Sequence, residues 1–151
     1  MTYRRADFGS RMLAFALDAL IAGLLFIMPL PIIRSILSAS YLLLRDVIMY
    51  EITGDKRWRN RSPGKRALGL QVVVETGTEK YKNLTRTVCL QRNFIPALGL
   101  IVGIIPLLGL ILAPIISLIV WIIELIAALS HPEKKRLGDR LARTIVIQEI
   151  P

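Results

Sequence analysis

Two carboxylates interrupt long apolar segments of this sequence. Asp18 lies within the apolar residues 12–33, and Glu124 is the charged residue of the apolar run 94–130. An ionisable side chain inside a membrane helix costs about 2.5–3.5 kcal/mol on insertion scales, so it normally has a buried partner or belongs to an ion pathway. These two carboxylates are therefore the first candidates for an ion or proton site.

The depth of the two carboxylates leaves two interpretations open. At the rise of an α-helix, Asp18 lies about 10.5 Å beyond Arg11, and Glu124 lies about 9 Å before the end of its apolar run. If they face each other, one would hold a proton and exchange it for a cation, because two carboxylates in a low dielectric cannot both ionise cheaply. Alternatively, Arg11, Arg45 or Arg92 neutralises them and they hold helices together.

Other chemistries find little support in the sequence. One Cys, Cys89, and one His, His131, cannot form an intrachain disulfide or a multi-ligand Cys/His metal site. Residues 62–65, Ser-Pro-Gly-Lys, lack the glycine spacing and the following hydroxyl of a phosphate-binding loop. No nucleophile stands beside a base. We therefore expect no enzyme, no cofactor and no metal.

Four membrane spans are predicted to position these residues. The chain has 151 residues, 54% of them hydrophobic, and a mean hydropathy of +0.55, which is typical of a membrane protein. The run 94–130 is too long for one crossing, and Pro106 to Gly109 offer a turn near its centre. A re-entrant segment is the alternative. The predicted spans are roughly 11–31, 32–50, 94–109 and 112–130.

Lys and Arg predict the orientation of these spans. Of the 20 Lys and Arg, all but Arg34 lie at or beyond the same predicted side of the membrane. Since basic residues concentrate in cytoplasmic segments, both termini and the loop 51–93 are expected inside a prokaryotic cell, with the spans in its inner (plasma) membrane. The net charge of +9 then indicates contact with anionic lipid rather than with nucleic acid.

The cytoplasmic loop contains a basic cluster that is a candidate for contact with lipid headgroups. Lys and Arg near a membrane surface attract anionic headgroups at about 1 kcal/mol each, and Trp favours the interface. Simple positive-inside topology is the alternative reading. The cluster comprises Lys56, Arg57, Trp58, Arg59, Arg61, Lys65 and Arg66.

Two short segments have the composition of strands. Residues 68–75 and 144–149 are rich in β-branched residues, and a Thr-Gly-Thr turn signal follows the first. They are expected to pair as a hairpin or two-stranded element against the inner face of the membrane. The predicted fold is thus an all-α membrane protein of about four transmembrane helices with a small cytoplasmic β element.

Gly99 and Gly103 have the spacing that lets two helices approach closely in a membrane. Packing within the chain and self-association into a homo-oligomer are both compatible with this pattern.

Asp139 has Arg136, Arg140 and Arg143 around it in the sequence, so it is expected to form a salt bridge that docks the C-terminal segment under the spans.

Three segments together resemble a known family. They are Phe8 to Asp18 (FGSRMLAFALD), Ser62 to Val73 (SPGKRALGLQVV) and Arg136 to Val146 (RLGDRLARTIV). In this order they resemble the RDD family of small membrane proteins, which is named for an Arg and two Asp. The resemblance covers nearly the whole chain and assigns the family motif to Arg11, Asp18 and Asp139. Arg92-Asn93 resembles the Arg-Asn pair that usually opens the third span of the family.

The resemblance implies a single RDD-type membrane domain over residues 1–151, and transport, including cation/proton exchange, as an activity proposed for some members. We expect a polytopic protein that moves cations, protons or a small solute through a site around Asp18 and Glu124, with Arg92 and Arg45 as structural charge partners. The alternative is a non-catalytic membrane subunit or scaffold of a larger complex, which contacts lipid through its basic loop.

Overall fold

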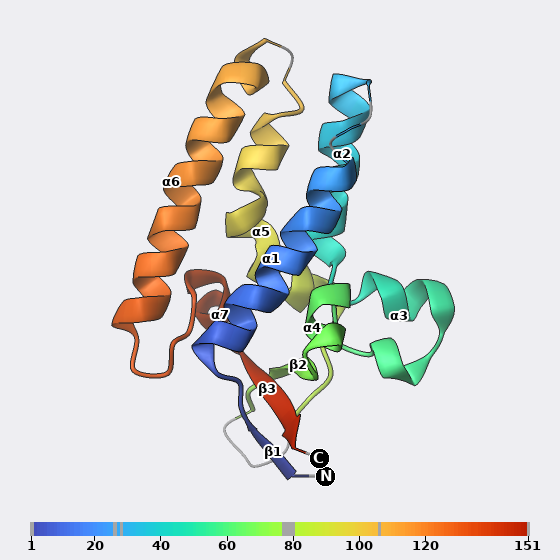
Figure 1. Ribbon diagram of the computed structural model, residues 1–151, viewed down its shortest axis with the longest axis vertical. Helices are drawn as coiled ribbons and strands as arrows, with labels where there is room; N and C mark the ends of the chain where they lie inside the picture. The colour runs from blue at the N-terminus through green and yellow to red at the C-terminus, as the bar shows by residue number, and fades with distance from the viewer. Residues whose placement is uncertain (1, 26, 28, 77–80, 106, 151) are drawn as a thin grey trace.

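The computed structural model describes residues 2–25, 27, 29–76, 81–105 and 107–150. Four longer helices extend from a small sheet, beside which both chain ends lie, as Figure 1 shows. Their bounds are α1 Phe8–Leu25, α2 Pro31–Leu44, α5 Arg86–Val102 and α6 Leu108–Ser130. The largely helical fold with a small β element agrees with the prediction.

Two of these helices are long and apolar enough to cross a membrane. They are α1 and α6, and a shorter apolar helix spans Ile32–Leu44. Large apolar side chains cover their outer faces: Leu24 of α1 is 66% exposed and Leu110 of α6 is 71% exposed. Such extensive apolar exposure is unusual for a water-soluble protein and suits a lipid environment. These two helices support a membrane protein, as predicted, but they do not by themselves establish the four predicted crossings.

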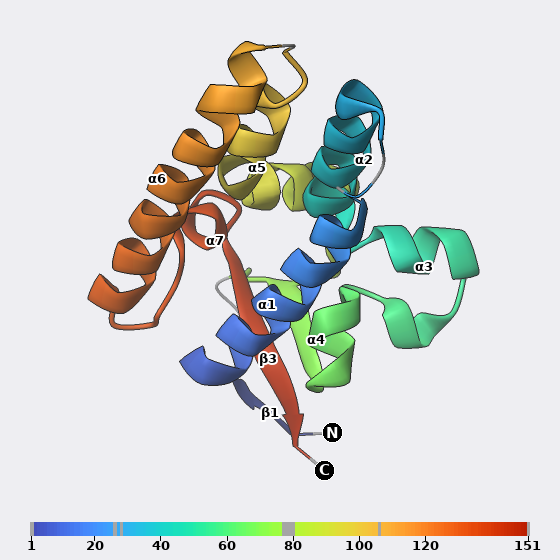
Figure 2. The ribbon, with the colours of Figure 1, turned by 45° about the horizontal axis from the view of Figure 1, so that its top comes forward.

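The second helix ends earlier than the predicted span 32–50. Helix α2 stops at Leu44, and Arg45 and Asp46 lie in the turn that follows. The short helix α3, Ile48–Thr53, then leads away to one side of the molecule (Figure 2). Both residues of this turn are buried, Arg45 against Asp18 of α1 and Asp46 against Lys65 and Arg92.

The third helix begins earlier than the predicted span 94–109. Thr85 caps α5, its Oγ1 accepting a hydrogen bond from the Val88 amide at 3.4 Å. Helix α5 ends at Val102 and α6 begins at Leu108, so the predicted break in the run 94–130 is confirmed. Pro106, part of the predicted turn, lies outside the described residues.

The sheet has three antiparallel strands rather than two. Strand β3, Thr144–Ile150, lies between β1, Thr2–Arg5, and β2, Leu70–Val74. Val72 pairs with Val146 across β2 and β3, which confirms the predicted pairing of the two β-branched segments. The N-terminal strand was not predicted, since its few residues include two arginines and acquire a strand conformation only by pairing with β3.

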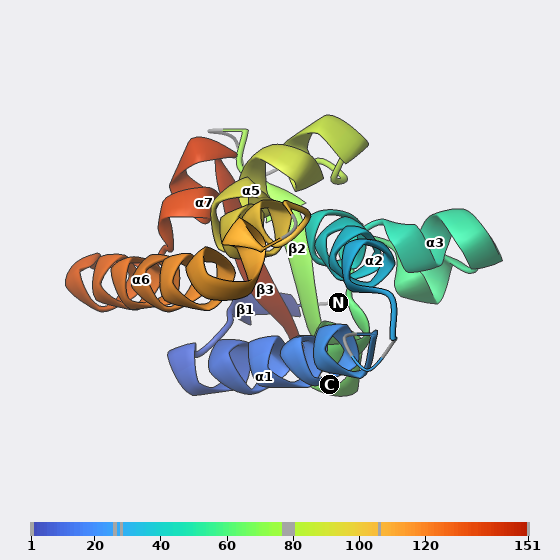
Figure 3. The same cartoon turned by 90° about the horizontal axis from the view of Figure 1, so that it is seen from above.

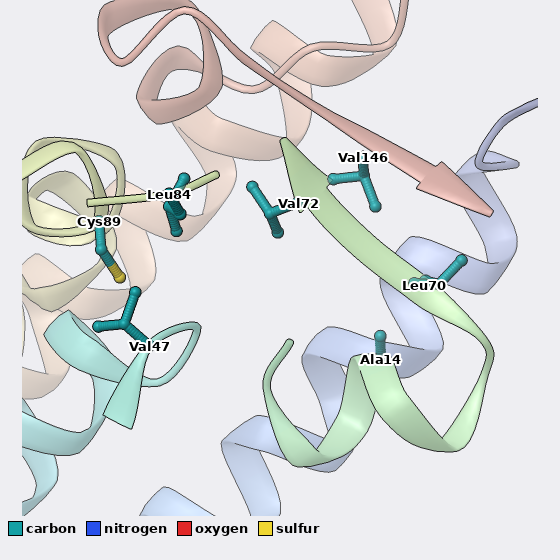
Figure 4. Close-up of a cluster of buried hydrophobic side chains, with 7 residues drawn as sticks. All are labelled: Ala14, Val47, Leu70, Val72, Leu84, Cys89 and Val146. Atoms are coloured by element: carbon teal, nitrogen blue, oxygen red, sulfur yellow. The ribbon is translucent and has the colours of Figure 1, made fainter. Parts of the chain in front are cut away.

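A compact apolar cluster joins the sheet to the helices. Leu70 and Val72 of β2 and Val146 of β3 point toward residues of α1 and α5 (Figure 4). The full cluster comprises Ala14, Val47, Leu70, Val72, Leu84, Cys89 and Val146. Because it includes residues from both the sheet and the helices, it holds the polar groups described below at the boundary between them.

Candidate functional site

Asp18 is completely buried where α1 meets the short helix α4, Pro63–Ala67. Its Oδ2 accepts a hydrogen bond from Ser62 Oγ at 2.6 Å, and its Oδ1 accepts one from the Gly64 amide at 2.9 Å. Arg45 Nη1 lies 3.5 Å from Oδ2, and Lys65 Nζ lies 3.9 Å from it. Both carboxylate oxygens are therefore satisfied by fixed donors and cations from the protein.

Gly64 is required at this contact. A Cβ on residue 64 would lie 2.2 Å from the carbonyl oxygen of Ala14 and 2.9 Å from Asp18 Oδ1. No side chain fits at these distances, so only glycine lets α4 approach the backbone of α1. The Ser-Pro-Gly segment thus binds the Asp18 carboxylate through the Ser62 hydroxyl and the Gly64 amide. Ser62 also caps α4.

A second buried carboxylate, Asp46, bridges α4 and α5. Its Oδ1 accepts from Lys65 Nζ at 2.5 Å, and its Oδ2 accepts from Arg92 Nη1 at 2.6 Å. Asn93 Nδ2 approaches the same oxygen at 3.4 Å. Burial lowers the pKa of Lys65 to about 8, although the charge of Asp46 opposes this shift.

Asp139 connects the C-terminal segment to helices α1 and α5. It lies on the short helix α7, Leu137–Leu141, and accepts hydrogen bonds from Arg92 Nε at 2.7 Å and Arg11 Nη2 at 2.5 Å. Arg136 Nε lies 3.7 Å away. Burial alone would raise the pKa of Asp139, but Arg92, Arg136 and Arg11 outweigh it and hold the pKa below its usual range.

These contacts form one continuous buried network, which we call the charge network. Arg92 binds both Asp46 and Asp139, and Lys65 lies beside both Asp46 and Asp18. Arg11 and Asp139 of the motif thus bind each other directly, and Asp18 is linked to them through residues outside the motif. The members are Arg11, Asp18, Arg45, Asp46, Lys65, Arg92, Arg136 and Asp139.

Glu124 has different partners from Asp18. Its Oε1 accepts a hydrogen bond from the Gly138 amide at 3.2 Å, whereas its Oε2 is buried and has no hydrogen-bond partner among the described residues. Gly138 packs closely, since a Cβ there would lie 2.0 Å from the Arg92 carbonyl oxygen. The structure brings Glu124 to α7 and Asp18 to α4, and no contact between the two carboxylates appears in the described part of the chain.

A cavity opens beside the charge network, and about 50 Å³ of it is accessible to the centres of water molecules. Its apolar wall includes Met12 and Phe15 of α1, Pro96 of α5 and Trp121 of α6, while Glu124 is the carboxylate among its lining residues. The basic lining residues are Arg11, Arg45, Lys65, Arg92, Lys134 and Arg136. Asp18 does not line the cavity, so of the two candidate carboxylates Glu124 is the one that borders it.

The predicted charge partners divide between different acids. Arg45 pairs with Asp18 and donates from Nη2 to Asn93 Oδ1 at 3.3 Å. Arg92 pairs with Asp46 and Asp139 rather than with either candidate carboxylate. Asp46 was not singled out from the sequence, although an Arg-Asp pair closing an apolar segment was a usable signal.

The basic cluster of the loop divides into exposed and engaged residues. Lys65 is a correction to the expected headgroup contact, because its side chain is buried against Asp46. Arg66 lies over the Trp58 ring at 4.0 Å, and Arg59 donates to Tyr50 Oη at 2.9 Å. A further ion pair joins Arg61 to Glu149. Lys56 and Arg57 are exposed, and their side chains form no ion pair with another described residue.

Gly99 of α5 and Gly103, which directly follows α5, both contact helices of the same chain. A Cβ at Gly99 would lie 1.8 Å from Ser117 Oγ of α6, and Gly103 accepts a hydrogen bond from Ser35 Oγ of α2 at 3.1 Å through its carbonyl. Both therefore permit packing of α5 within the chain. Among the described residues, no group of three or more His, Cys, Asp or Glu is placed to hold a metal ion.

Comparisons with known proteins identify the family of this chain. No curated protein and no solved structure significantly matches the chain. The sequence model of the RDD family matches residues 5–143, a segment that includes Arg11, Asp18, Arg92 and Asp139. Because this match covers nearly the whole chain, the protein belongs to the RDD family.

Proposed function

We propose that the protein is a non-catalytic membrane subunit or scaffold, in which the charge network fixes a cytoplasmic sheet and short helices to the membrane helices. The observation that carries this proposal is the complete pairing of Asp18. It is fully buried, and Ser62, Gly64, Arg45 and Lys65 surround its two oxygens.

A carboxylate with such partners is poorly suited to exchange a proton for a cation. A transported cation would have to displace the guanidinium of Arg45 and the ammonium of Lys65, both of which belong to the fold. Leaving such groups unpaired in a buried site costs several kcal/mol, so the exchange would be strongly opposed. The geometry thus favours the structural role over the transport role for Asp18.

The proposed topology is multi-pass, with α1, α2, α5 and α6 crossing the inner membrane of a prokaryote. Both chain ends lie beside the sheet, on the opposite side of the molecule from the α5–α6 connection (Figure 1). Most Lys and Arg belong to the chain segments that contain or adjoin the three strands, residues 4–11, 56–92 and 134–143, which supports a cytoplasmic location for the sheet and both termini. Contact of Lys56 and Arg57 with anionic headgroups belongs to the same proposal.

The test is ion flux in proteoliposomes of the purified protein, under imposed sodium, potassium and proton gradients. We expect no flux above that of protein-free vesicles, and we expect Asp18→Asn to lower the unfolding temperature. Asp18→Asn keeps the shape of the side chain but removes the negative charge that faces Arg45 and Lys65. Measuring both flux and unfolding temperature in the wild type and in this variant therefore separates an effect on transport from an effect on folding. Flux in the wild type that Asp18→Asn abolishes, with the fold intact, would refute the proposal.

One observation favours transport as a second candidate. Glu124 lines the cavity, and its Oε2 is buried without a partner. A proton carrier needs such access to open space, and Glu124 has it whereas Asp18 does not. Flux that is lost in Glu124→Gln and retained in Asp18→Asn would establish this second function in place of the first.

A further inference from the structure

The cavity beside the charge network has an excess of positive charge. Arg11, Arg92 and Lys65 each donate to a carboxylate of the network, but two of the lining arginines are less well neutralised. Arg45 shares Asp18 with other donors, and Arg136 approaches Asp139 only at 3.7 Å. An anion in this cavity would supply the charge that these two guanidinium groups lack.

Arg45 brings incompletely satisfied hydrogen-bond donors to the cavity. The residue is 1% exposed, its Nε has no hydrogen-bond partner among the described residues, and its Nη1 lies 3.5 Å from Asp18 Oδ2 as an ion pair without a hydrogen bond. Buried donors without acceptors are costly, and native structures normally satisfy them with protein, water or a ligand. Since Arg45 lines the cavity, an oxygen-rich anion there would accept these hydrogen bonds.

The walls around these cations are apolar and aromatic. Phe15 of α1 contacts Trp121 of α6 with ring centroids 5.8 Å apart, and Arg45 and Arg136 both lie against the Phe15 ring, at 5.2 Å and 5.9 Å from its centroid. Leu125 of α6 continues the apolar lining. A ligand of this cavity therefore needs an anionic group next to hydrocarbon.

The cavity lies between two helices that pack mainly on other elements. Helix α1 packs on α2 and α4, and α6 packs on α5 and α7. Viewed from above, α1 and α6 stand apart (Figure 3), and side chains from both line the cavity. Their outer faces carry exposed apolar residues such as Leu13 and Ile122, which suits acyl chains alongside them.

We propose that this cavity binds the phosphate group of an anionic membrane phospholipid, with Arg136 and Arg45 at the phosphate and the acyl chains between α1 and α6. The accessible volume of about 50 Å³ holds roughly four water-sized groups, which is comparable with a phosphate. Guanidinium groups bind phosphate with paired, charge-assisted hydrogen bonds. The site requires the membrane location and does not depend on whether the protein is a scaffold or a transporter.

A phospholipid fits this position better than a free anion. Arg11 lies near the start of α1 and Arg136 follows α6, so the cavity is at the end of both helices that faces the sheet. Headgroup phosphates lie at this depth if the sheet is cytoplasmic. The apolar side chains around the cations would gain nothing from inorganic phosphate. The site is also separate from the exposed loop residues Lys56 and Arg57.

Native mass spectrometry of the full-length protein in detergent tests this proposal. The probes are phosphatidylglycerol and phosphatidic acid, a diacylglycerol with the same acyl chains, and inorganic phosphate as a competitor. We expect saturable binding of one phospholipid per chain, no comparable binding of diacylglycerol, and no competition by inorganic phosphate at equal concentration. We expect Arg136→Gln to weaken phospholipid binding at least about tenfold, the size of one charged hydrogen bond.

Two further variants make the test specific. Arg4→Gln removes the same charge from an exposed position on β1 and is expected to bind as the wild type does. Met12→Trp keeps every charge but fills the cavity, and it is expected to exclude the lipid even if Arg136→Gln does not fold. Wild-type affinity in Met12→Trp, equal losses in Arg136→Gln and Arg4→Gln, or equal binding of diacylglycerol would overturn the proposal. Effective competition by inorganic phosphate would assign the site to a free anion instead.

Discussion

Substitution of Gly64 by alanine tests whether the contact between α4 and α1 is as close as the structure indicates. The added methyl group would lie 2.2 Å from the Ala14 carbonyl oxygen and 2.9 Å from Asp18 Oδ1. Backbone lies on the Ala14 side of this clash, so relief requires α4 to move away from α1. That movement would lengthen or break the 2.9 Å hydrogen bond from the Gly64 amide to Asp18.

The expected destabilisation has two parts. Overpacking in a close contact costs about 1–3 kcal/mol. Loss of a hydrogen bond to a buried charged group costs about 1.5–3 kcal/mol. We therefore expect Gly64→Ala to lower the free energy of unfolding by about 3–5 kcal/mol, and at about 2–4 °C per kcal/mol to lower the unfolding temperature by roughly 6–20 °C.

Gly23→Ala is the matched control. Gly23 lies in α1, and a Cβ there has nothing within 4 Å, so alanine should leave the stability unchanged or raise it by about 0.5–1 kcal/mol through helix propensity. Unfolding of both variants would be followed by fluorescence and size exclusion in the same detergent. Equal unfolding temperatures for Gly64→Ala and Gly23→Ala would refute the close contact.

Combining Gly64→Ala with Asp18→Asn sharpens the interpretation. If alanine acts partly by displacing the amide from Asp18, then Asp18→Asn should cost less in the Gly64→Ala background than in the wild type. A double-mutant cycle measures this difference directly. Additive effects of the two substitutions would show that the clash with Ala14 alone causes the loss.

Three further outcomes follow from the charge network and the packing of α5. Arg92→Gln should cost about 3–5 kcal/mol, and Arg92→Lys should not restore stability in thermal unfolding, because one ammonium cannot bind Asp46 and Asp139 in the same way. The wild type should lose stability as pH falls below about 4, because the paired carboxylate of Asp139 has a depressed pKa in the folded protein. Unfolding temperatures measured from pH 3 to 7 should show this loss in the wild type, and Asp139→Asn should lack the part of it that comes from Asp139. Gly99→Ala should destabilise the protein without changing its oligomer mass by light scattering, and Ser117→Gly should restore stability by removing the contact; a changed mass would point to self-association instead.

The sequence predicts the elements better than it predicts how they meet. The apolar runs and the β-branched segments predicted the main helices and the pairing of β2 with β3, since burial of apolar surface and strand propensity are local properties. The N-terminal strand was missed because residues 2–5 form a strand only through β3, which lies at the other end of the chain.

The candidate site shows the same division. The depth of Asp18 and Glu124 along their helices is countable from the sequence, but the direction in which each side chain faces depends on which neighbours surround the helix. Asp18 faces α4, and Glu124 faces α7. Hydropathy does not specify these neighbours, so the sequence left open whether the two acids meet, and the structure gives them different partners.

The distribution of the charge network along the sequence gives the motif a physical meaning. Arg11 comes from the first helix, whereas its partner Asp139 comes from the last one. Asp18 depends on residues 62–65, and Arg92 needs both Asp46 and Asp139. Each buried charge is therefore left unpaired until distant segments have assembled, and unpaired buried charges are expensive. A chain in which some of these segments have not yet assembled retains this energetic cost. The motif residues therefore favour the complete arrangement of helices and sheet over partial ones. This structural role requires no transported ion.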